Sequence, residues 1–458
     1  MCTYVLSHSL PPAPCSLPGI RNLNTHKSKH LKLIANLAPM SIRHPAAVFL
    51  CMAMAMSLVW SRALLSIIPV IFIFLVAVDI EINPFRVKWV LTPKNVFGMI
   101  KYKPFIIVFA LYFLLFVVSI VYAGNLSEWW QLTHPKFPFI ILPLGFLVLK
   151  PFSRKEYMLI TLSMIVLAVW STIWVQVAFY SEHYLFSQSL GFGGSLPTPI
   201  NHIRYSVVIS LSMIICLAFA IEGWKLRYSW ERWAYGLTSV YLFYFLHVLS
   251  VRSGLAIAYA GIFLMVLFYL RKFNPVSRLA IIACIVIAPF LAYKVLPGFE
   301  QKINYTIYDL GMFKQDQGNA YSDSERWQSW RAGIVIGNQH PFFGTGPGKF
   351  RTSLKTYYKD ELKKDDFTRP HNQFINVFAE FGLFGLAVFL FFLLYPMTFR
   401  FFWKPPLIPV LYIMQILTML VEHPLDTEFG SMLFVLLTVL GLSYQDGLPG
   451  STTGYKPV

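Results

Sequence analysis

Long apolar runs, nearly free of charge, recur along the whole chain and are separated by shorter polar stretches. Most of these runs approach the length that a helix needs to cross a hydrocarbon core of about 30 Å. Backbone groups in lipid have to be hydrogen-bonded within their own segment, so the runs predict helices; a β-barrel would alternate apolar and polar residues. We predict about twelve spans, at residues 45–60, 63–79, 105–123, 137–149, 157–180, 203–221, 233–250, 254–270, 279–296, 374–395, 407–421 and 428–444.

This pattern predicts an all-α integral membrane protein with one large loop between its ninth and tenth helices. Residues 40–296 hold helices 1–9, the polar segment 297–373 is the loop with amphipathic helices, residues 374–445 hold helices 10–12, and 446–458 is a tail. Residues 1–39 are polar and basic and show no periodicity. We expect them to be either a disordered tail or a stretch that precedes the natural start at Met40.

Composition supports the membrane class. Hydrophobic residues make up 56% of the chain and charged residues 13%, whereas a soluble domain carries about 25% charged residues. The protein therefore has little soluble mass, and membrane lipids are its principal surroundings.

Lys and Arg are distributed unevenly between alternate loops, which predicts the orientation. The basic loops carry Arg86, Lys88, Lys94, Lys101 and Lys103; Lys150, Arg154 and Lys155; Lys225, Arg227 and Arg232; Arg271, Lys272 and Arg278; and Arg400 and Lys404. The loops poor in positive charge are Gly124 to Lys136, Ser181 to His202, and Glu422 to Glu428. The basic set is cytoplasmic by this rule, so both termini are cytoplasmic and the 297–373 loop faces outward.

The net charge of +17 fits this orientation. The positive charge mainly serves to attract the cytoplasmic loops to the anionic inner leaflet of the membrane. We therefore expect no nucleic-acid partner. No cysteine lies in the outer loop, which excludes a disulfide framework or a cysteine-based metal site there.

The stretch 322–385 is a polar island in an apolar chain, and it carries the candidate chemistry. His371 follows Pro370 at the start of a predicted span. A neutral imidazole can accept a proton from a sugar hydroxyl, which makes His371 a candidate general base. An interfacial or helix-capping histidine is the alternative.

Arg326 and Arg331 lie in 322–337, where Trp327, Trp330 and Ile334 have helical spacing. This predicts an amphipathic helix on the membrane surface, capped by one of the serines at its start. The two guanidinium groups could clamp phosphate oxygens in bidentate fashion. The alternative is that they form the wet face of the helix.

Two further arginines lie at the predicted outer ends of spans. Arg252 is held in a very short connection, and Arg204 begins another span. If both side chains converge on one outer vestibule, they predict that it binds an anionic ligand. Alternatively, either side chain could extend to the lipid headgroups.

Two short segments complete the candidates. Gly344-Thr345-Gly346-Pro347-Gly348-Lys349 lacks the Walker A spacing and is either a ligand-approaching turn or a plain tight turn. The segment from Glu422 through His423 to Asp426 could orient a catalytic group or bind a sugar hydroxyl. No metal-ligand spacing stands out, so no metal is expected.

The chain resembles the bacterial O-antigen ligase superfamily, which includes O-antigen polymerases and protein O-oligosaccharyltransferases. The resemblance lies in R-W-Q-S-W-R-A, H-P-F-F-G-T-G-P-G-K-F and H-N-Q-F-I-N-V-F-A-E-F-G-L-F-G-L, with S-V-R-S-G upstream. It implies a GT-C-like fold in the bacterial inner membrane, with the active site facing the periplasm.

The resemblance also implies a reaction: inverting transfer of a glycan from undecaprenyl diphosphate, without metal or other cofactor. His371 matches the histidine held to activate the acceptor hydroxyl, and Arg252 and Arg326 match positions held to bind the diphosphate. Asp426 falls where a functional acidic residue occurs. Arg204 and Arg331 rest on the physical argument alone, and Asn372 and His423 are expected to support the site.

Three functions remain open at this stage. The first is a ligase that joins O-antigen to a lipid A–core acceptor, and the second is a glycan polymerase of the same fold. The third is a transporter, which is disfavoured because its charges should lie near the middle of the spans rather than at their outer ends.

Overall fold

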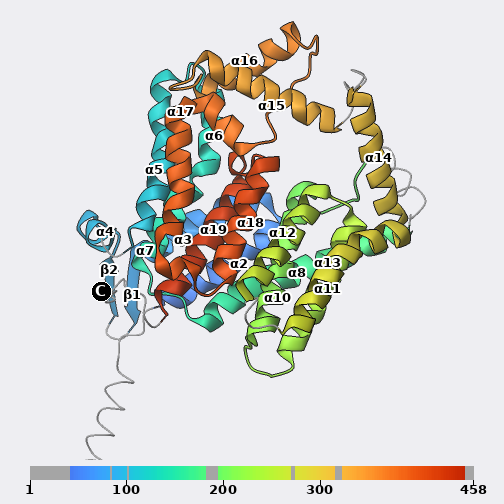
Figure 1. Ribbon diagram of the computed structural model, residues 1–458. Coiled ribbons are helices and arrows are strands. Elements are labelled where there is room, and N and C mark those ends of the chain that lie inside the picture. The colour runs from blue at the N-terminus through green and yellow to red at the C-terminus, as the bar shows by residue number, and fades with distance from the viewer. Residues whose placement is uncertain are drawn as a thin grey trace, which may run out of the picture.

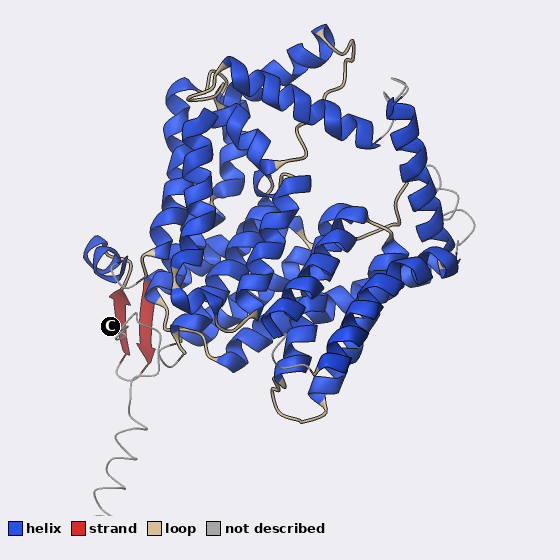
Figure 2. Cartoon of the chain, viewed as in Figure 1, coloured by secondary structure: helices blue, strands red, loops and turns tan. Residues whose placement is uncertain are grey.

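The computed structural model describes residues 42–82, 85–100, 103–181, 194–269, 274–314 and 322–448. The predicted tail 1–39 and most of the tail 446–458 lie outside these residues. Helices dominate the described chain (Figures 1 and 2).

Every predicted span overlaps a helix. In chain order these helices are α2 (Arg43–Trp60), α3 (Arg62–Ala77), α5 (Phe105–Val118), α7 (Pro138–Val148), α8 (Arg154–Ser181), α10 (His202–Glu222), α11 (Glu231–Leu249), α12 (Arg252–Tyr269), α13 (Pro275–Val295), α17 (Gln373–Leu394), α18 (Leu407–Val421) and α19 (Glu428–Asp446). Seven stretches of the described chain are long and apolar enough to cross a membrane: Arg43–Trp60, Phe105–Tyr122, Arg154–Ser181, His202–Glu222, Arg252–Tyr269, Gln373–Thr398 and Glu428–Asp446. The protein is therefore a multi-pass membrane protein.

The remaining elements are short or lie in the loops. They are α4 (Pro93–Ile100), η1 (Ser119–Tyr122), α6 (Leu126–Thr133), η2 (His134–Lys136), α14 (Pro297–Lys314), α15 (Ser322–Gln339), α16 (Pro347–Asp360), η5 (Tyr395–Thr398), η6 (Arg400–Trp403) and η7 (Pro424–Asp426).

One part of the all-α prediction is wrong. β1 (Val78–Ile82) and β2 (Phe85–Trp89) form an antiparallel hairpin, with Asp79 opposite Lys88. The predicted span 63–79 runs into this hairpin, because α3 ends at Ala77. The residues V-D-I-E-I and F-R-V-K-W alternate apolar with charged side chains, which is the period of a strand rather than of a helix.

The long loop and the three loops predicted to be poor in positive charge contact one another. Arg351 on α16 pairs with Glu128 on α6 at 3.3 Å. Lys302 on α14 donates to the Gly194 carbonyl at 3.3 Å, and Lys136 pairs with Asp426 at 3.0 Å. In Figure 1 this end of the bundle, crossed by α15 and α16, lies opposite the connection between α10 and α11. All four loops therefore gather at one end.

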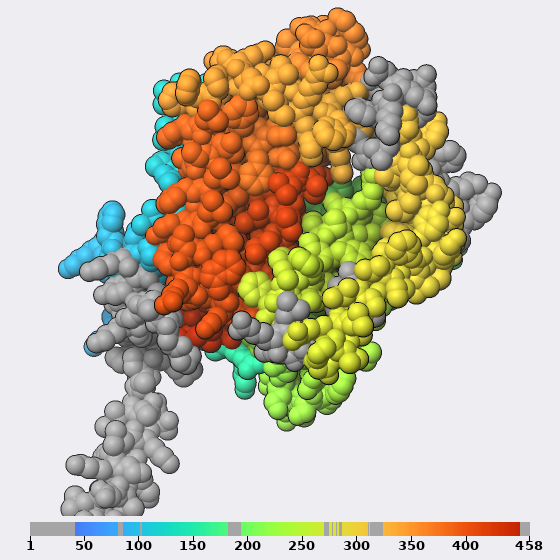
Figure 3. Space-filling view, viewed as in Figure 1, coloured from blue at the N-terminus to red at the C-terminus, as the bar shows by residue number. Residues whose placement is uncertain are grey.

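The long loop has a small hydrophobic core, to which α17 contributes Ala379. Ala332 and Ile336 of α15 pack with Phe350, Leu354 and Tyr358 of α16. On its other side α15 crosses α17 closely: a Cβ on Gly333 would meet Pro370 and Ile375, and one on Gly337 would meet Phe378. Trp327 and Ile334, two of the residues that predicted a helix on the membrane surface, remain exposed, so that placement stays a prediction. Figure 3 shows the orange surface of α15 and α16 capping one end of the molecule.

The glycine-rich turn after α15 is a structural turn. Gly344 has φ 68° and lies against the backbone of Glu380, where any Cβ would clash. Thr345 and Gly346 donate backbone hydrogen bonds to the carbonyls of Ala379 and Glu380. Gly382, with φ 65°, breaks α17 at the same point. Of the two interpretations of this turn, the structure supports the plain one, because Gly344 lies against α17 and Gly346 and Gly348 lie against Tyr122 and Ala123.

Candidate functional site

A cavity of about 180 Å³ opens where the start of α10, the end of α18, η7 and α19 meet. Its polar wall includes Arg204, His371, Glu422 and His423. Its apolar wall includes Val207, Met419, Leu433 and Phe434. A cavity with a polar mouth and an apolar floor suits a ligand that has a charged head and a hydrocarbon tail.

Local sequence holds His371 firmly at this cavity. Pro370 keeps the preceding backbone extended, and Asn372 caps α17 by accepting from the backbone N–H groups of Phe374 and Ile375. The Asn372 amide also donates to the Leu420 carbonyl at 3.0 Å. The Trp330 indole N–H donates to the His371 carbonyl at 3.1 Å. The segment before α17 is thus fastened to both α15 and α18.

Glu422 joins the candidate base to an arginine. His371 Nδ1 lies 3.1 Å from Glu422 Oε2, and Arg326 Nη2 lies 3.3 Å from Glu422 Oε1. Burial opposes ionisation of Glu422, but the His371 hydrogen bond and the charge of Arg326 outweigh it and lower the pKa of this carboxyl. A carboxylate only accepts, so neutral His371 donates from Nδ1 and leaves Nε2 unprotonated.

His423 lies beside His371, with ring centroids 5.6 Å apart. Burial lowers the pKa of His423 to about 4, so this ring is neutral near pH 7. His371, Glu422 and His423 also form a group whose candidate ligand atoms lie within 4.8 Å of one another. Two imidazoles and a carboxylate are a donor set that suits Zn²⁺, which the sequence spacing did not indicate. Arg326 and Arg204 line the same region and favour an anion instead.

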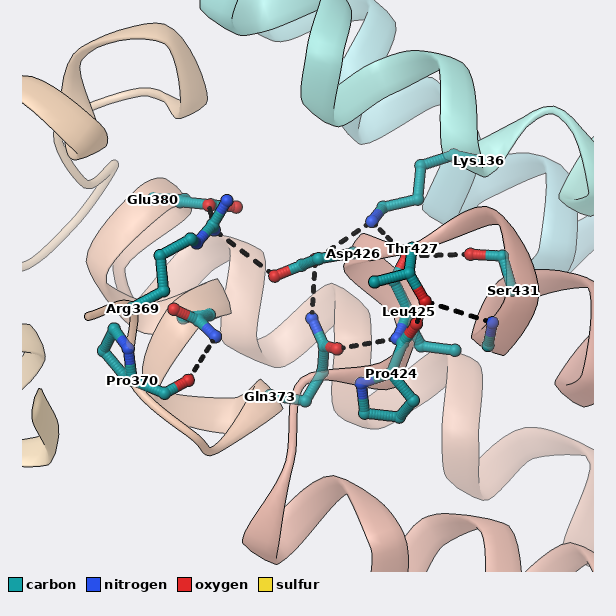
Figure 4. A network of polar contacts seen from close by, with 12 residues as sticks. Lys136, Arg369, Pro370, Gln373, Glu380, Pro424, Leu425, Asp426, Thr427 and Ser431 are labelled. Carbon is teal, nitrogen blue, oxygen red and sulfur yellow. Dashed lines mark hydrogen bonds and ion pairs between the residues drawn. The ribbon is translucent and has the colours of Figure 1, made fainter. Parts of the chain in front are cut away.

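Asp426 does not line the cavity but forms the centre of a buried polar network, shown in Figure 4. Lys136 Nζ lies 3.0 Å from Oδ1, the Gln373 amide donates to the same oxygen at 3.0 Å, and Arg369 Nη2 lies 3.3 Å from Oδ2. Arg369 also pairs with Glu380. Burial works against ionisation of Asp426, but Lys136 and Arg369 hold the pKa of this carboxyl well below its usual range.

This network connects the two segments that carry the candidate base and its partner. Arg369 lies two residues before His371, and Asp426 lies four residues after Glu422. Gln373 accepts from the Leu425 N–H at 3.0 Å, and Lys136 donates to the Leu425 carbonyl. The buried charges therefore fix the start of α17 relative to η7.

The structure brings some of the predicted arginines to the site and leaves others apart. Arg326 contacts Glu422, and Arg204 lines the cavity. Arg252 does not line it; its guanidinium donates to Thr306 of α14 at 3.1 Å. Arg331 lies on the exposed side of α15 and is likewise not part of the cavity wall.

Sequence reasoning assigned no site role to Lys136, Arg369 or Glu380. Lys136 is the one lysine or arginine in its predicted outer loop, which is a weak signal for a buried partner. Arg369 pairs with both Glu380 and Asp426, and this connection could not be read from spacing because Asp426 lies in another loop.

Comparison with known proteins gives one family match. Residues 237–390 match the family model described as O-Antigen ligase (Wzy_C). None of the curated proteins compared with the chain matches it. The matched range runs from α11 into α17 and includes Arg252, Arg326 and His371, whereas Arg204, Glu422 and Asp426 lie outside it.

Proposed function

We propose that the chain is an O-antigen ligase, because residues 237–390 match the family model described as O-Antigen ligase. It transfers a glycan from undecaprenyl diphosphate to a hydroxyl of a lipid A–core acceptor. The observation that carries the proposal is the arrangement of His371, Glu422 and Arg326 beside a cavity that Arg204 also lines. This arrangement joins a base to cations that suit a diphosphate.

In the proposed reaction, the acceptor oxygen attacks the anomeric carbon on the face opposite the diphosphate. The bond from that carbon to the diphosphate oxygen breaks, so the configuration inverts. The proton of the hydroxyl passes to His371 Nε2, and Glu422 stabilises the imidazolium and holds its orientation. This division of work requires the acceptor hydroxyl within about 3 Å of Nε2.

The leaving diphosphate needs its negative charge balanced in the transition state. Arg326 and Arg204 supply positive charge at the cavity, and the substrate would displace part of the Arg326–Glu422 contact. Arg252, Asn372 and His423 remain candidates in supporting positions, whereas Arg331, on the exposed side of α15, is given no role. We propose that these cations act in place of a metal. Full activity with a chelator supports this, whereas chelator-dependent loss restored by Zn²⁺ would assign the His371–Glu422–His423 group to a metal.

A polymerase is the second candidate, because the matched domain is shared by O-antigen ligases and polymerases. Deletion of the gene followed by gel analysis of lipopolysaccharide separates the two. A ligase deletion leaves core without glycan while carrier-linked polymer persists. A polymerase deletion leaves core with a single repeat unit, and this result would replace our assignment.

We propose that the site faces the periplasm from the inner membrane, because the three short loops at its end of the bundle, residues 124–136, 181–202 and 422–428, are poor in lysine and arginine. The exposed residue Lys359 on α16 tests this orientation. A Lys359→Cys protein should react with an impermeant thiol reagent in cells whose outer membrane alone is permeable. Cys51 and Cys216 are buried and should give little background, and the unsubstituted protein measures the background from the other three cysteines. Labelling that needs inner-membrane lysis would reverse the orientation.

Arg326→Lys is expected to lower kcat/KM for transfer about 10- to 100-fold, the loss of one or two charged hydrogen bonds. Lysine keeps the charge but cannot grip a phosphate with two parallel N–H groups. The measurement uses purified protein with carrier-linked glycan and acceptor. Arg331→Lys is the matched comparison, because it lies on the exposed side of the same helix. Equal losses in both variants would contradict the assignment of Arg326 as the phosphate clamp.

A further inference from the structure

The extra-membrane helices α15 and α16 enclose a second cleft, of about 310 Å³. Ile336 and Gln339 line it from α15, and Ser353, Thr356, Tyr357 and Asp360 line it from α16 and its last turn. The cleft is separate from the cavity at His371, with which it shares no lining residue.

The polar side chains of this cleft are not used by the protein. Among the described residues, the side chains of Gln339, Ser353, Thr356 and Asp360 form no hydrogen bond with any other group. Together they offer hydroxyl, amide and carboxylate groups, and so both donors and acceptors, around one concave surface. A ligand rich in hydroxyl groups could satisfy many of them at once.

The cleft also has an apolar component. The Tyr357 ring is half-buried and packs against the small core of α15 and α16, and Ile336 belongs to that core. An aromatic ring fixed in this way offers a flat apolar face and a polar hydroxyl edge. Pyranose rings have the same division, with C–H faces and hydroxyl edges.

Charge restricts the ligand further. Asp360 and Glu361 line the cleft, while no lysine or arginine does. Carboxylates without a cation disfavour phosphate and other anions. The many polar groups disfavour an acyl chain, whose burial would leave them unpaired.

The cleft lies within reach of the proposed reaction site. Arg326 and Ile336 are on the same helix, ten residues apart, which corresponds to about 15 Å along the axis. A glycan whose reacting end lies at His371 could therefore extend along α15 to the cleft.

We propose that this cleft binds a sugar unit of a glycan chain, remote from the unit that reacts. The inference rests on the proposed glycan transfer and adds a second subsite to it. The chain bound there comes either from the carrier-linked donor or from the acceptor. In both cases the site recognises uncharged sugar hydroxyls and favours chains long enough to span the two sites.

The test compares donors of one and of several repeat units with purified full-length protein. The main variant is Thr356→Ala/Asp360→Ala, because both side chains are exposed and neither supports the fold. Its KM for the long donor should rise about tenfold, the effect of losing two hydrogen bonds. Its kcat, and its KM for the single-unit donor, should stay unchanged. Lys355→Ala/Lys359→Ala is the control on the same helix, since neither lysine lines the cleft.

The acceptor is varied in the same way, with full-length and truncated core. A rise in KM confined to the full-length core supports the sugar site and assigns it to the acceptor. Unchanged KM values for every long substrate, or equal rises for long and short ones, would overturn the proposal.

A binding measurement separates this proposal from the proposed function. Oligosaccharides released from the carrier by mild acid are mixed with the protein, and saturation-transfer NMR detects contact. Signals lost in Thr356→Ala/Asp360→Ala and retained in Lys355→Ala/Lys359→Ala support the cleft even if the protein transfers no glycan. Equal signals in both variants would contradict it.

Discussion

Replacing His371 by glutamine is expected to reduce the rate of glycan transfer about 10²- to 10⁴-fold, the usual contribution of a general base. Glutamine nearly retains the size and hydrogen-bonding capacity of the side chain but cannot accept a proton from the acceptor hydroxyl. The backbone contacts that hold this position, from Trp330 to the residue 371 carbonyl and from the Asn372 cap, do not involve the imidazole. The variant should therefore fold and bind the carrier lipid normally.

The measurement is single-turnover transfer with saturating carrier-linked glycan, alongside carrier binding by the same purified protein. Glu422→Gln is the companion variant, because it keeps a hydrogen-bond partner for His371 Nδ1 but removes the charge that stabilises the imidazolium. We expect a smaller loss in Glu422→Gln than in His371→Gln. Near-normal turnover by His371→Gln would withdraw the base assignment and leave this residue a positioning role.

The transmembrane helices could be predicted because burial in lipid leaves the backbone one solution over a long apolar run. The twelve predicted ranges all overlap helices for this reason. The hairpin at 78–89 was missed because Val78 and Ile80 continue the apolar character of α3, while the alternation typical of strands covers only a few residues on each side of the turn.

The candidate site was only half predictable. His371 and Arg326 stand out because charge and imidazole are costly beside a membrane, so their presence in a polar island is informative. Glu422 was noted as a residue that could orient a catalytic group, but its pairing with His371 depends on how α18 packs against α17. Arg252 and Arg331 have the same local signal as Arg326, yet only the fold determines which arginines contact the Glu422 region.

The surroundings of helix α15 also could not be predicted from the sequence alone. Its tryptophans and arginines resemble those of an interfacial helix, and hydrophobic spacing cannot distinguish lipid from protein as the apolar partner. Gly333 and Gly337 allow α17 to approach one side of α15, while Trp327 and Ile334 stay exposed.

The largest stability effect should come from Asp426→Asn, which is expected to destabilise the protein by about 3–5 kcal/mol. Lys136 and Asp426 are 0% and 3% exposed, and Arg369 shares the same carboxylate. Asparagine keeps the shape of the Asp426 side chain but removes its negative charge. The buried cations of Lys136 and Arg369 then lack the carboxylate that balances them. The loss of stability should appear as faster unfolding in detergent. Unfolding is measured by the rate at which the buried thiols of Cys51 and Cys216 become reactive.

The exposed pair Arg351–Glu128 provides the control. Arg351 is half exposed, so Glu128→Gln should cost less than about 1 kcal/mol. Lys136→Met added to Asp426→Asn removes one of the stranded cations and should recover part of the lost stability. Equal losses in the single and double variants would mean that the Lys136 charge is not what Asp426 balances.

The pH dependence identifies the charge of Asp426 as the cause. Lys136 and Arg369 hold the pKa of Asp426 below its value in the unfolded chain, which is about 3.9. Its ionisation therefore contributes full stability above that pH, and the contribution disappears as the pH falls toward the folded-state pKa. The stability difference between wild type and Asp426→Asn should be constant from about pH 8 to 5 and shrink below about pH 4. A difference that persists undiminished in acid would show that geometry, rather than the buried charge, makes Asp426 necessary for joining η7 to the start of α17.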